Sequence, residues 1–521
     1  MRHHLFFCLA TFSLFFSLIE LLFSCNQVKR NNKHPKISDE SIVEGKRLSS
    51  LYCQSCHLLP EPSLLDSKTW EKGVLPQMAP RLGIFEFNYQ RYPYVNDGVL
   101  KDYYPTKPVI TNEQWQNIIN YYIASAPDSL SKQKHENKIA EPFSLFSPEL
   151  PSFTYNNPSS SYIKIEQKAS SQDLIVCDLF KQTIYQYDKK LKIVDSMISS
   201  GAIVDMDLKN EGMLTCNIGT LNPTNYSYGE ARYIKLNSKG KMQKEKTPLF
   251  KNLTRPVQIT SADLNKDGKT DFVVCEFGYL KGALSWMENT GTEQFERHVI
   301  RNVAGAVKVY VEDYNHDGLE DLWVLFAQGE EGIFLFTNKG NGNFDEQEIL
   351  RFPSVYGSSY FELKDFNNDG YSDIVYTCGD NADYSNTLKP YHGVYVFLND
   401  GNNHFKQQFF FPVNGCYKAI ARDFDNDGDI DIATIAYFAD FSRHPEEGFI
   451  YLENEGKFTF KQHTLPETQK GRWMTMDAGD LDGDGDIDIV LGNFSLGPVM
   501  MRSKSDWTKG PPFILLKNTG K

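Results

Sequence analysis

Two cysteines and a histidine near the N-terminus have the spacing of a covalent cofactor-attachment motif. Cys53-Gln54-Ser55-Cys56-His57 reads CxxCH, in which two thiols two residues apart can each bond one vinyl group of a porphyrin while the adjacent imidazole reaches the iron. A bare redox or zinc pair is the alternative, but zinc needs further ligands and the next cysteine is Cys177. We predict one covalent haem c on Cys53 and Cys56, with His57 as the proximal ligand.

The second axial ligand is sought among the residues that follow. Between residues 58 and 150 the only methionine is Met78 and the only histidine is His135. Met78 is flanked by Pro76 and Pro80, which favour a stiff, extended loop, whereas His135 lies in a polar linker. We predict Met78 as the ligand, since a thioether opposite imidazole suits electron transfer. If Met78 only fills the core, the iron is five-coordinate and ligand chemistry reopens.

A nine-residue acidic motif occurs five times in the C-terminal two-thirds of the chain. The copies read DLNKDGKTD, DYNHDGLED, DFNNDGYSD, DFDNDGDID and DLDGDGDID. Oxygen-bearing side chains recur at offsets 1, 3, 5 and 9, and glycine at offset 6 permits a tight turn around a cation. The motif differs from an EF-hand because strand-like residues follow it instead of a glutamate at offset 12. We predict up to five Ca²⁺ ions.

The predicted ligand set includes the residue at offset 7. It consists of Asp263, Asn265, Asp267, Lys269 and Asp271; Asp313, Asn315, Asp317, Leu319 and Asp321; Asp365, Asn367, Asp369, Tyr371 and Asp373; Asp423, Asp425, Asp427, Asp429 and Asp431; and Asp480, Asp482, Asp484, Asp486 and Asp488.

An Asn-x-Gly hairpin signal follows each acidic motif. The two signals together define a unit of about 50 residues, the length of a four-stranded blade. The units resemble FG-GAP or VCBS repeats, which also form the heads of integrin α chains. Two degenerate units near residues 173–177 and 212–216 raise the count to seven blades. The chain ends where the last outer strand should begin, so we predict that residues 153–155 supply that strand and close the ring.

Residues 38–128 resemble a small class I cytochrome c. A helix containing Gly45 leads into the CxxCH motif, and a capping box at Thr111 begins a second helix rich in aromatic residues. In that family the glycine allows the terminal helices to cross closely, which implies Tyr121 or Tyr122 as its packing partner. The expected fold is multidomain: a small all-α cytochrome c domain, a linker at 129–150, and an all-β seven-bladed propeller at 151–521.

The N-terminus has the layout of an exported lipoprotein. An apolar run follows Arg2 and ends in Ser24-Cys25, which resembles a bacterial lipobox, so residues 1–24 are predicted as a signal peptide, Cys25 as the lipidated residue and 25–37 as a tether. The alternative is an uncleaved membrane anchor, which Glu20 disfavours. Both alternatives place the remainder outside the cytoplasm, held at a membrane of the bacterial cell envelope. The tether carries no acidic run, which favours a periplasm-facing position over the cell surface.

Composition and motifs narrow the function classes. A formal net charge of −13 argues against nucleic-acid binding, and no Ser-His-Asp set, Walker loop or HExxH pair is present. Three functions stay open: single-electron transfer to a redox partner protein, a haem-linked enzyme with substrate on the propeller, and a module that binds glycan or protein through propeller loops. Tyr226, Tyr228, Tyr384 and Tyr391 are candidate loop contacts, and the strand cysteines 177, 216, 275 and 378 are predicted to be buried packing residues.

Overall fold

A computed structural model describes His34, residues 36–134 except 100 and 102, Ile139, and residues 143–520 except for six short gaps, which are 169–170, 210–211, 245–246, 292–293, 383–386 and 498–505. The chain divides into a helical unit of residues up to Gln54, 61–92 and 105–130, and a second unit of 55–60, 93–104 and 131–521. The predicted signal peptide and Cys25 lie outside the described residues, as do His135 and Tyr384. Within the described part, no helix has the length and apolarity that crossing a bilayer requires.

Two long helices form the core of the helical unit. Helix α2 (Asp39–Tyr52) begins at Ser38, whose hydroxyl accepts a hydrogen bond from the Ser41 amide, and α5 (Asn112–Ser125) begins with the predicted capping box of Thr111 and Gln114. A β-carbon added at Gly45 would lie 1.9 Å from the Asn117 carbonyl oxygen and 2.7 Å from Tyr121 Cβ. Only glycine permits so close an approach, so the predicted crossing at Gly45, with Tyr121 as its neighbour, is confirmed.

The segment around Met78 is helical, which corrects the prediction of an extended loop. Residues 67–82 form successive helical turns: α3 (Ser67–Thr69), the π-helical η4 (Trp70–Val74), α4 (Leu75–Met78) and the 3₁₀ turn η5 (Ala79–Leu82). Pro76 and Pro80 each stand in the first turn of their helix, where a missing amide hydrogen costs no intrahelical bond. The prolines therefore start helical turns here and do not prevent them.

The remaining elements of this part of the chain are short. They are η2 (Cys53–Ser55), η3 (Pro62–Leu64), β1 (Glu86–Phe87) and β2 (Gln90–Arg91).

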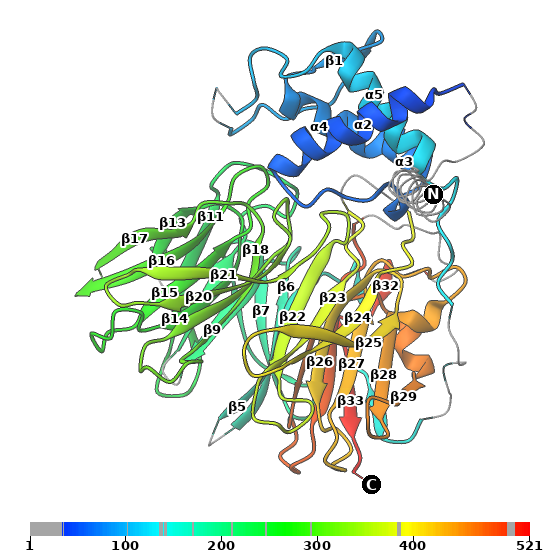
Figure 1. The fold of residues 1–521 in the computed structure, drawn as a ribbon. Coiled ribbons are helices and arrows are strands. Elements are labelled where there is room, and N and C mark those ends of the chain that lie inside the picture. Colours follow the sequence, from blue (N-terminus) through cyan, green and yellow to red (C-terminus); the bar gives the residue numbers. More distant parts are fainter. Residues whose placement is uncertain are drawn as a thin grey trace, which may run out of the picture. The chain divides into compact units, whose positions relative to one another are not determined.

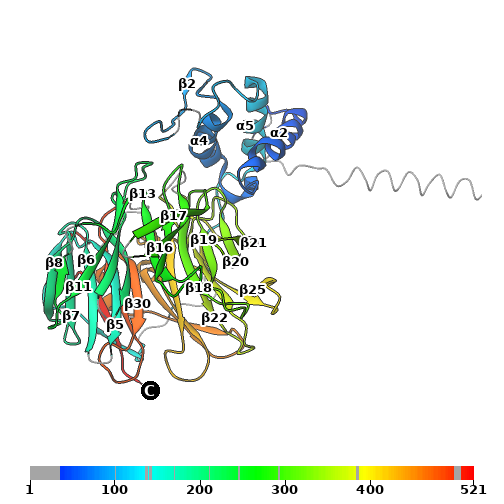
Figure 2. The same cartoon turned by 90° about the vertical axis from the view of Figure 1, so that its left-hand side faces the viewer.

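Seven antiparallel sheets form the propeller, and these are named blades 1 to 7 (Figures 1 and 2). The strands of each blade are given from the axis outward. Blade 1 has β5 (Ser160–Lys168), β6 (Ser171–Asp178), β7 (Thr183–Asp188) and β8 (Ile193–Ile198). Blade 2 has β9 (Ile203–Lys209), β10 (Gly212–Asn217) and β11 (Gly229–Leu236), with β12 (Met242–Lys244) and β13 (Phe250–Leu253) both at its outer edge. Blade 3 has β14 (Pro256–Ala262), β15 (Asp271–Glu276), β16 (Ala283–Gly291) and β17 (Gln294–Arg301). Blade 4 has β18 (Ala306–Glu312), β19 (Asp321–Phe326), β20 (Gly332–Asn338) and β21 (Phe344–Arg351). Blade 5 has β22 (Ser358–Lys364), β23 (Asp373–Cys378), β24 (Gly393–Asn399) and β25 (Phe405–Pro412). Blade 6 has β26 (Cys416–Arg422), β27 (Asp431–Ala436), β28 (Phe449–Asn454) and β29 (Phe460–His463). Blade 7 has β30 (Trp473–Gly479), β31 (Asp488–Asn493), β33 (Phe513–Asn518) and β3 (Phe146–Glu149).

The ring is closed by a strand from the start of the propeller, as expected, but the predicted segment is wrong. Strand β3 pairs with β33, so that Phe146 lies opposite Asn518 and Glu149 opposite Leu515. This closing strand lies inside the segment predicted as linker. Residues 155–156 instead form β4 (Tyr155–Asn156), which pairs with β32 (Lys509–Gly510) in a separate ribbon. Pro148 fits at β3 because an outermost strand leaves one row of amides without ladder partners.

Apolar side chains between neighbouring blades make the propeller core. One cluster, for example, joins Val273 and Trp286 of blade 3 to Val324 and Phe334 of blade 4. The four strand cysteines predicted as packing residues are buried free thiols, each in a different interblade cluster. Two short helices, η6 (Pro445–Gly448) and η7 (Pro466–Lys470), lie in connections of blades 6 and 7.

Candidate metal and cofactor sites

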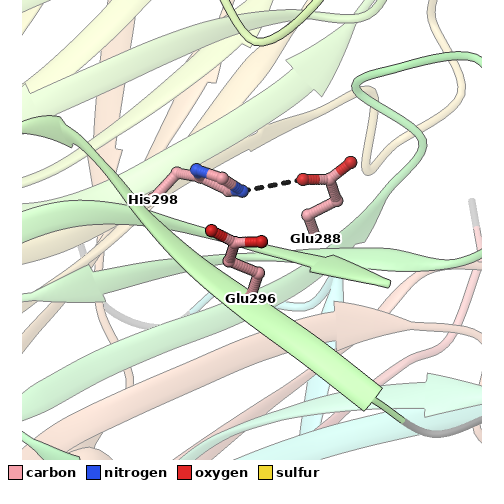
Figure 3. Close-up of side chains that lie close together, drawn as sticks. All are labelled: Glu288, Glu296 and His298. Atoms are coloured by element: carbon pink, nitrogen blue, oxygen red, sulfur yellow. Dashed lines mark hydrogen bonds and ion pairs between the residues drawn. The ribbon is translucent and has the colours of Figure 1, made fainter. Parts of the chain in front are cut away.

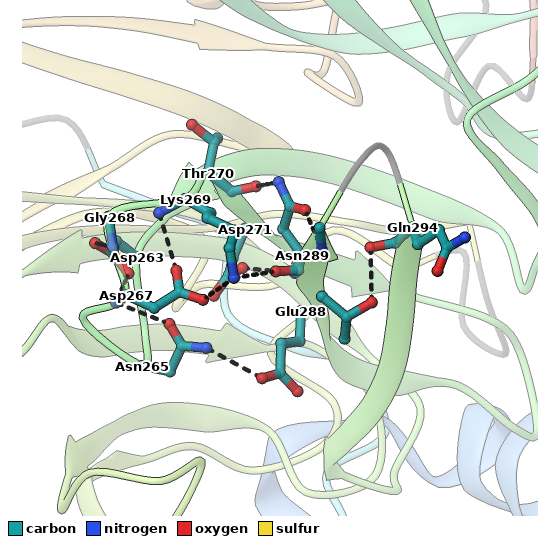
Figure 4. A network of polar contacts seen from close by, with 12 residues as sticks. Asp263, Asn265, Asp267, Gly268, Lys269, Thr270, Asp271, Glu288, Asn289 and Gln294 are labelled. Carbon is teal, nitrogen blue, oxygen red and sulfur yellow. Dashed lines mark hydrogen bonds and ion pairs between the residues drawn. The ribbon is translucent and has the colours of Figure 1, made fainter.

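The five acidic motifs, named loops one to five in chain order, fold in one way. In each, the aspartate at offset 1 accepts the amides of offsets 5 and 6 on its two carboxylate oxygens; in loop one, Asp263 accepts from Asp267 at 3.0 Å and from Gly268 at 3.0 Å (Figure 4). The same pair of bonds is made by Asp313, Asp365, Asp423 and Asp480. The five loops therefore adopt the same turn, which brings their side-chain oxygen atoms together.

The aspartate at offset 9 is the first residue of the second strand of its blade and is fully buried. One of its oxygens accepts the amide of the asparagine at the end of the third strand, which lies at the same end of the blade: Asp431 accepts from Asn454 at 2.8 Å and Asp488 from Asn518 at 2.8 Å. The other three loops make the same bond. This carboxylate was predicted only as a cation ligand, and the structure shows that it also ties the acidic loop to the hairpin.

Loops four and five bring three carboxylates together. Ligand atoms of Asp423, Asp425 and Asp431 lie within 4.8 Å of one another, as do those of Asp480, Asp482 and Asp488. Burial raises the pKa of Asp431 to about 7 and that of Asp488 to about 6. Carboxylates this close repel one another when ionised, and a divalent cation would offset that repulsion.

The residue that precedes each hairpin asparagine differs in charge from blade to blade. Blade 3 has Glu288, whose Oε1 accepts from Asn265 of loop one at 3.1 Å, and blade 6 has Glu453, whose charge acts on Asp425 of loop four. Blade 7 has Lys517, whose ammonium pairs with Asp482 and lies 3.9 Å from Asp484. The loops thus share a backbone but differ in the charge placed beside it.

A second group of possible metal ligands was not found from the sequence. Glu288, Glu296 and His298 on β16 and β17 present ligand atoms within 4.8 Å of one another (Figure 3). Glu288 lies opposite Glu296 across the strand pair, and His298 Nε2 is 2.7 Å from Glu288 Oε2. Blade 6 repeats the Glu–His pair as Glu453 and His463, with Lys461 in the place of Glu296. A cross-strand Glu–His contact is therefore common to both blades, and in blade 3 Glu296 adds a third possible ligand.

The CxxCH motif begins where α2 ends. Cys53 is half-buried in η2, and Cys56 is exposed; neither is in a disulfide bond. His57 Nδ1 is 2.8 Å from the Leu58 carbonyl oxygen. A carbonyl oxygen only accepts, so Nδ1 carries the proton and the neutral ring has its lone pair on Nε2. Met78 is half-buried at the end of α4.

Of the aromatic loop residues, Tyr226 and Tyr228 form a stacked, solvent-facing pair. Their ring centroids are 5.3 Å apart, and their exposed fractions are 42% and 63%. Tyr391 instead packs against Tyr356 at 4.6 Å, and burial raises its pKa strongly. Of these three described tyrosines, Tyr226 and Tyr228 are the ones that face solvent, whereas Tyr391 is packed.

Comparison with known proteins agrees with the repeat structure. The family model described as an FG-GAP-like repeat matches residues 263–324, 313–376, 365–434 and 423–491, overlapping stretches that each begin at one acidic loop and extend past the next. Integrin alpha-PS3 of Drosophila melanogaster is 30% identical over 141 residues, which are 22% of this chain and 13% of that protein. Cartilage acidic protein 1 of Xenopus tropicalis is 31% identical over 182 residues, which are 32% of this chain and 26% of that protein.

The chain therefore covers at most 26% of the length of these two curated relatives. Among solved structures, the Dos1 propeller aligns over 70% of this chain and 82% of its own, with a TM-score of 0.40 and 8% sequence identity. The repeats matched by the family model and the seven sheets lead to one conclusion: the C-terminal part of this chain is a seven-bladed β-propeller with FG-GAP-like repeats.

Proposed function

We propose that the protein is a c-type cytochrome of the bacterial cell envelope that transfers single electrons, with its propeller as the docking platform for a redox partner protein. The CxxCH motif directly after α2 carries this proposal. The crossing of α2 and α5 at Gly45 supports it, because this is the helix arrangement expected of the cytochrome c family that the segment resembles. FG-GAP-like repeats fit a binding platform.

The residues present fit a covalently bound haem. Cys53 and Cys56, which form no disulfide, would form the two thioether bonds, and His57 would bind the iron through Nε2, the nitrogen on which its tautomer places the lone pair. The haem would supply one-electron transfer. Met78 would be the second axial ligand, from the end of a helix. Burial raises the pKa of Tyr121 to about 12, which keeps this phenol near Cys53 neutral.

The proposal includes Ca²⁺ in up to five loops. Oxygen donors converge in each loop, and three carboxylates meet in loops four and five, an arrangement suited to a hard cation that prefers oxygen. The ion would act as a structural brace that holds each acidic loop against its blade. Lipidation at Cys25 would hold the mature protein at the membrane.

The test is production of the full chain together with cytochrome-maturation machinery. We expect haem that stays with the polypeptide under denaturing conditions, a reversible one-electron wave, and no binding of carbon monoxide by the reduced form. The variant Met78→Ala should bind carbon monoxide, because loss of the thioether opens the iron.

A double variant, Cys53→Ala with Cys56→Ala, should lose covalent haem, whereas Ser55→Ala in the same motif should keep it. Haem-free intact protein from competent cells would contradict the proposal. Circular dichroism of each variant separates loss of haem from loss of folding.

The second candidate function is a glycan- or protein-binding module, and the exposed Tyr226–Tyr228 stack favours it. Stacked phenols offer a flat apolar face to a sugar ring or an aromatic side chain. A glycan array probed with the intact protein and with Tyr228→Ala tests it: binding that this substitution removes, and that Cys53→Ala with Cys56→Ala leaves unchanged, would assign the propeller a role separate from electron transfer.

A further inference from the structure

The innermost strands of the seven blades surround the propeller axis, where propellers have a central channel. Polar side chains from these strands form a group that we name the axial ring. The axial ring consists of Tyr162, Lys164, Asp205, Gln258, Lys308, Tyr310, Tyr360, Glu362, Lys418 and Asp477. The acidic loops and the CxxCH motif do not include any of these residues.

Most acceptors of the axial ring hold neighbouring blades together. Asp477 accepts the Ile165 amide of the next blade at 2.8 Å, and Glu362 accepts the Ala421 amide at 2.8 Å. Asp205 and Gln258 make the same kind of bond to the amides of the blades that follow them. These side chains have a repeated structural role, since each one satisfies a backbone donor at a seam between blades.

Two of the acceptors also neutralise a cation. Lys164 Nζ is 3.1 Å from Asp477 Oδ1, and Arg422 is 2.6 Å from Glu362 Oε1. Asp205 lies near Lys308 and keeps two backbone hydrogen bonds. The anions of the axial ring are therefore largely engaged by amides and by these two pairs.

Lys308 and Lys418 are the exception. Within the described residues, neither ammonium has a carboxylate within 4.0 Å. Lys418 Nζ lies 4.7 Å and Lys308 Nζ 5.9 Å from the centroid of the same ring, that of Tyr360, and Lys308 is also 4.9 Å from the Tyr310 ring. Two cations thus share one aromatic side chain, and the carboxylates that act on them lie beyond ion-pair distance: Asp205 for Lys308, and Asp477 and Glu362 for Lys418.

The surroundings of Lys308 and Lys418 disfavour the charged form of both side chains. Burial lowers the pKa of Lys308. Burial and the positive charges of Lys308 and Lys164 lower the pKa of Lys418 to about 8, and the negative charges of Asp477 and Glu362 offset only part of this shift. The two ammonium groups, each partly exposed, also repel one another. A negatively charged ligand beside both ammonium groups would remove this repulsion.

We propose that the axial ring binds one small oxyanion, of the phosphate or carboxylate class, between Lys308 and Lys418. The two ammonium groups provide charge and hydrogen-bond donors, and the rings of Tyr310 and Tyr360 hold the lysine side chains in place. This site is independent of haem and of calcium. It would make the centre of the propeller a ligand site in addition to its outer loops.

Isothermal titration calorimetry of the intact protein with inorganic phosphate, sulfate and acetate, at constant ionic strength, tests the proposal. We expect one site per chain for at least one of the three anions, and their order separates a phosphate site from a carboxylate site. The double variant Lys308→Met with Lys418→Met should bind at least tenfold more weakly. Lys209→Met removes an innermost-strand lysine that is paired with Asp207 at 3.6 Å, and this control should bind normally.

A second measurement does not depend on variants. Acetylation of the intact protein with an amine-reactive ester, followed by peptide mass spectrometry, should show Lys308 and Lys418 protected at least threefold by the bound anion and Lys209 unprotected. Absence of binding for all three anions, equal affinity in the double variant, or labelling of the two lysines that the anion leaves unchanged would each overturn the assignment.

Discussion

Blades 1 and 2 share one turn with blades 3 to 7 but differ from them in the connection between the first two strands. At the end of the third strand, all seven use an aspartate or asparagine whose side chain accepts the amide two residues on, as in Asp188 to Lys190 at 2.9 Å and Asn338 to Gly340 at 2.8 Å. The other five are Asn237, Asn289, Asn399, Asn454 and Asn518. The connection between the first two strands differs: β5 ends two residues before β6 begins, whereas an acidic loop separates β14 from β15.

This difference shows which feature the blade requires. This side-chain turn is present in every blade, including blade 7, whose outermost strand β3 comes from a distant segment. The turn therefore belongs to the fold itself. The acidic loop is an addition that only five blades have, and its offset-9 aspartate links it to the hairpin asparagine. Blades 3 to 7 therefore have an acidic loop, followed by a fully buried aspartate, where only two residues separate the first two strands of blades 1 and 2. We expect only blades 3 to 7 to depend on a cation.

Removal of divalent cations should have the largest effect. A ligand held at 100 times its dissociation constant stabilises the folded state by about 2.7 kcal/mol per site, so chelation with EGTA should lower the Tm by at least about 5 °C in a chain of this size. Hydrogen exchange should accelerate in loops one to five and stay unchanged in β5–β6 and β9–β10. Equal acceleration in all seven blades would break the distinction between the two groups.

Substitution of the offset-9 aspartate should have the next largest effect. Asp431 accepts from Asn454 at 2.8 Å, from Tyr451 at 2.6 Å and from Phe424 at 3.1 Å, so Asp431→Ala leaves three buried donors without this acceptor. We expect a loss of about 3 kcal/mol in the free energy of unfolding, measured by denaturant titration. Asp173→Ala in blade 1, where the carboxylate accepts from Gln186 at 2.9 Å, is the matched control and should cost about 1 kcal/mol.

The repeats and the number of blades were predictable because each unit has its own local signals. Five glycine-containing acidic loops and five Asn-x-Gly turns fix the period without knowledge of any distant contact. Gly45 was predictable for a related reason, since a single residue type satisfies a close helix crossing. Local patterns were thus enough wherever one short segment determines the geometry.

Features that depend on distant segments were predicted wrongly or not at all. The closing strand Phe146–Glu149 has no local strand signal and contains Pro148, and only its pairing with β33, more than 360 residues away, makes it a strand. Pro76 and Pro80 favour an extended loop at Met78 when the sequence is considered alone, but both prolines lie in helical turns. The axial lysines, Lys308 and Lys418, come from separate blades and meet only in the closed ring.

The smallest effect is expected from the charge beside each loop, and it separates members within the group of five. Lys517 pairs with Asp482 of loop five, but about a third of its side chain is exposed, so solvent screens the interaction. We expect Lys517→Met to raise the calcium affinity of loop five about threefold to tenfold, measured as the Ca²⁺ concentration that half-protects residues 480–488 from hydrogen exchange.

Glu453→Lys should lower the affinity of loop four. Lys339→Met removes a hairpin lysine that pairs with Asp345 at 3.3 Å, outside the acidic loops, and should change neither. If Lys517→Met weakened calcium binding, its ammonium would be holding the carboxylates of loop five in position and not competing for them.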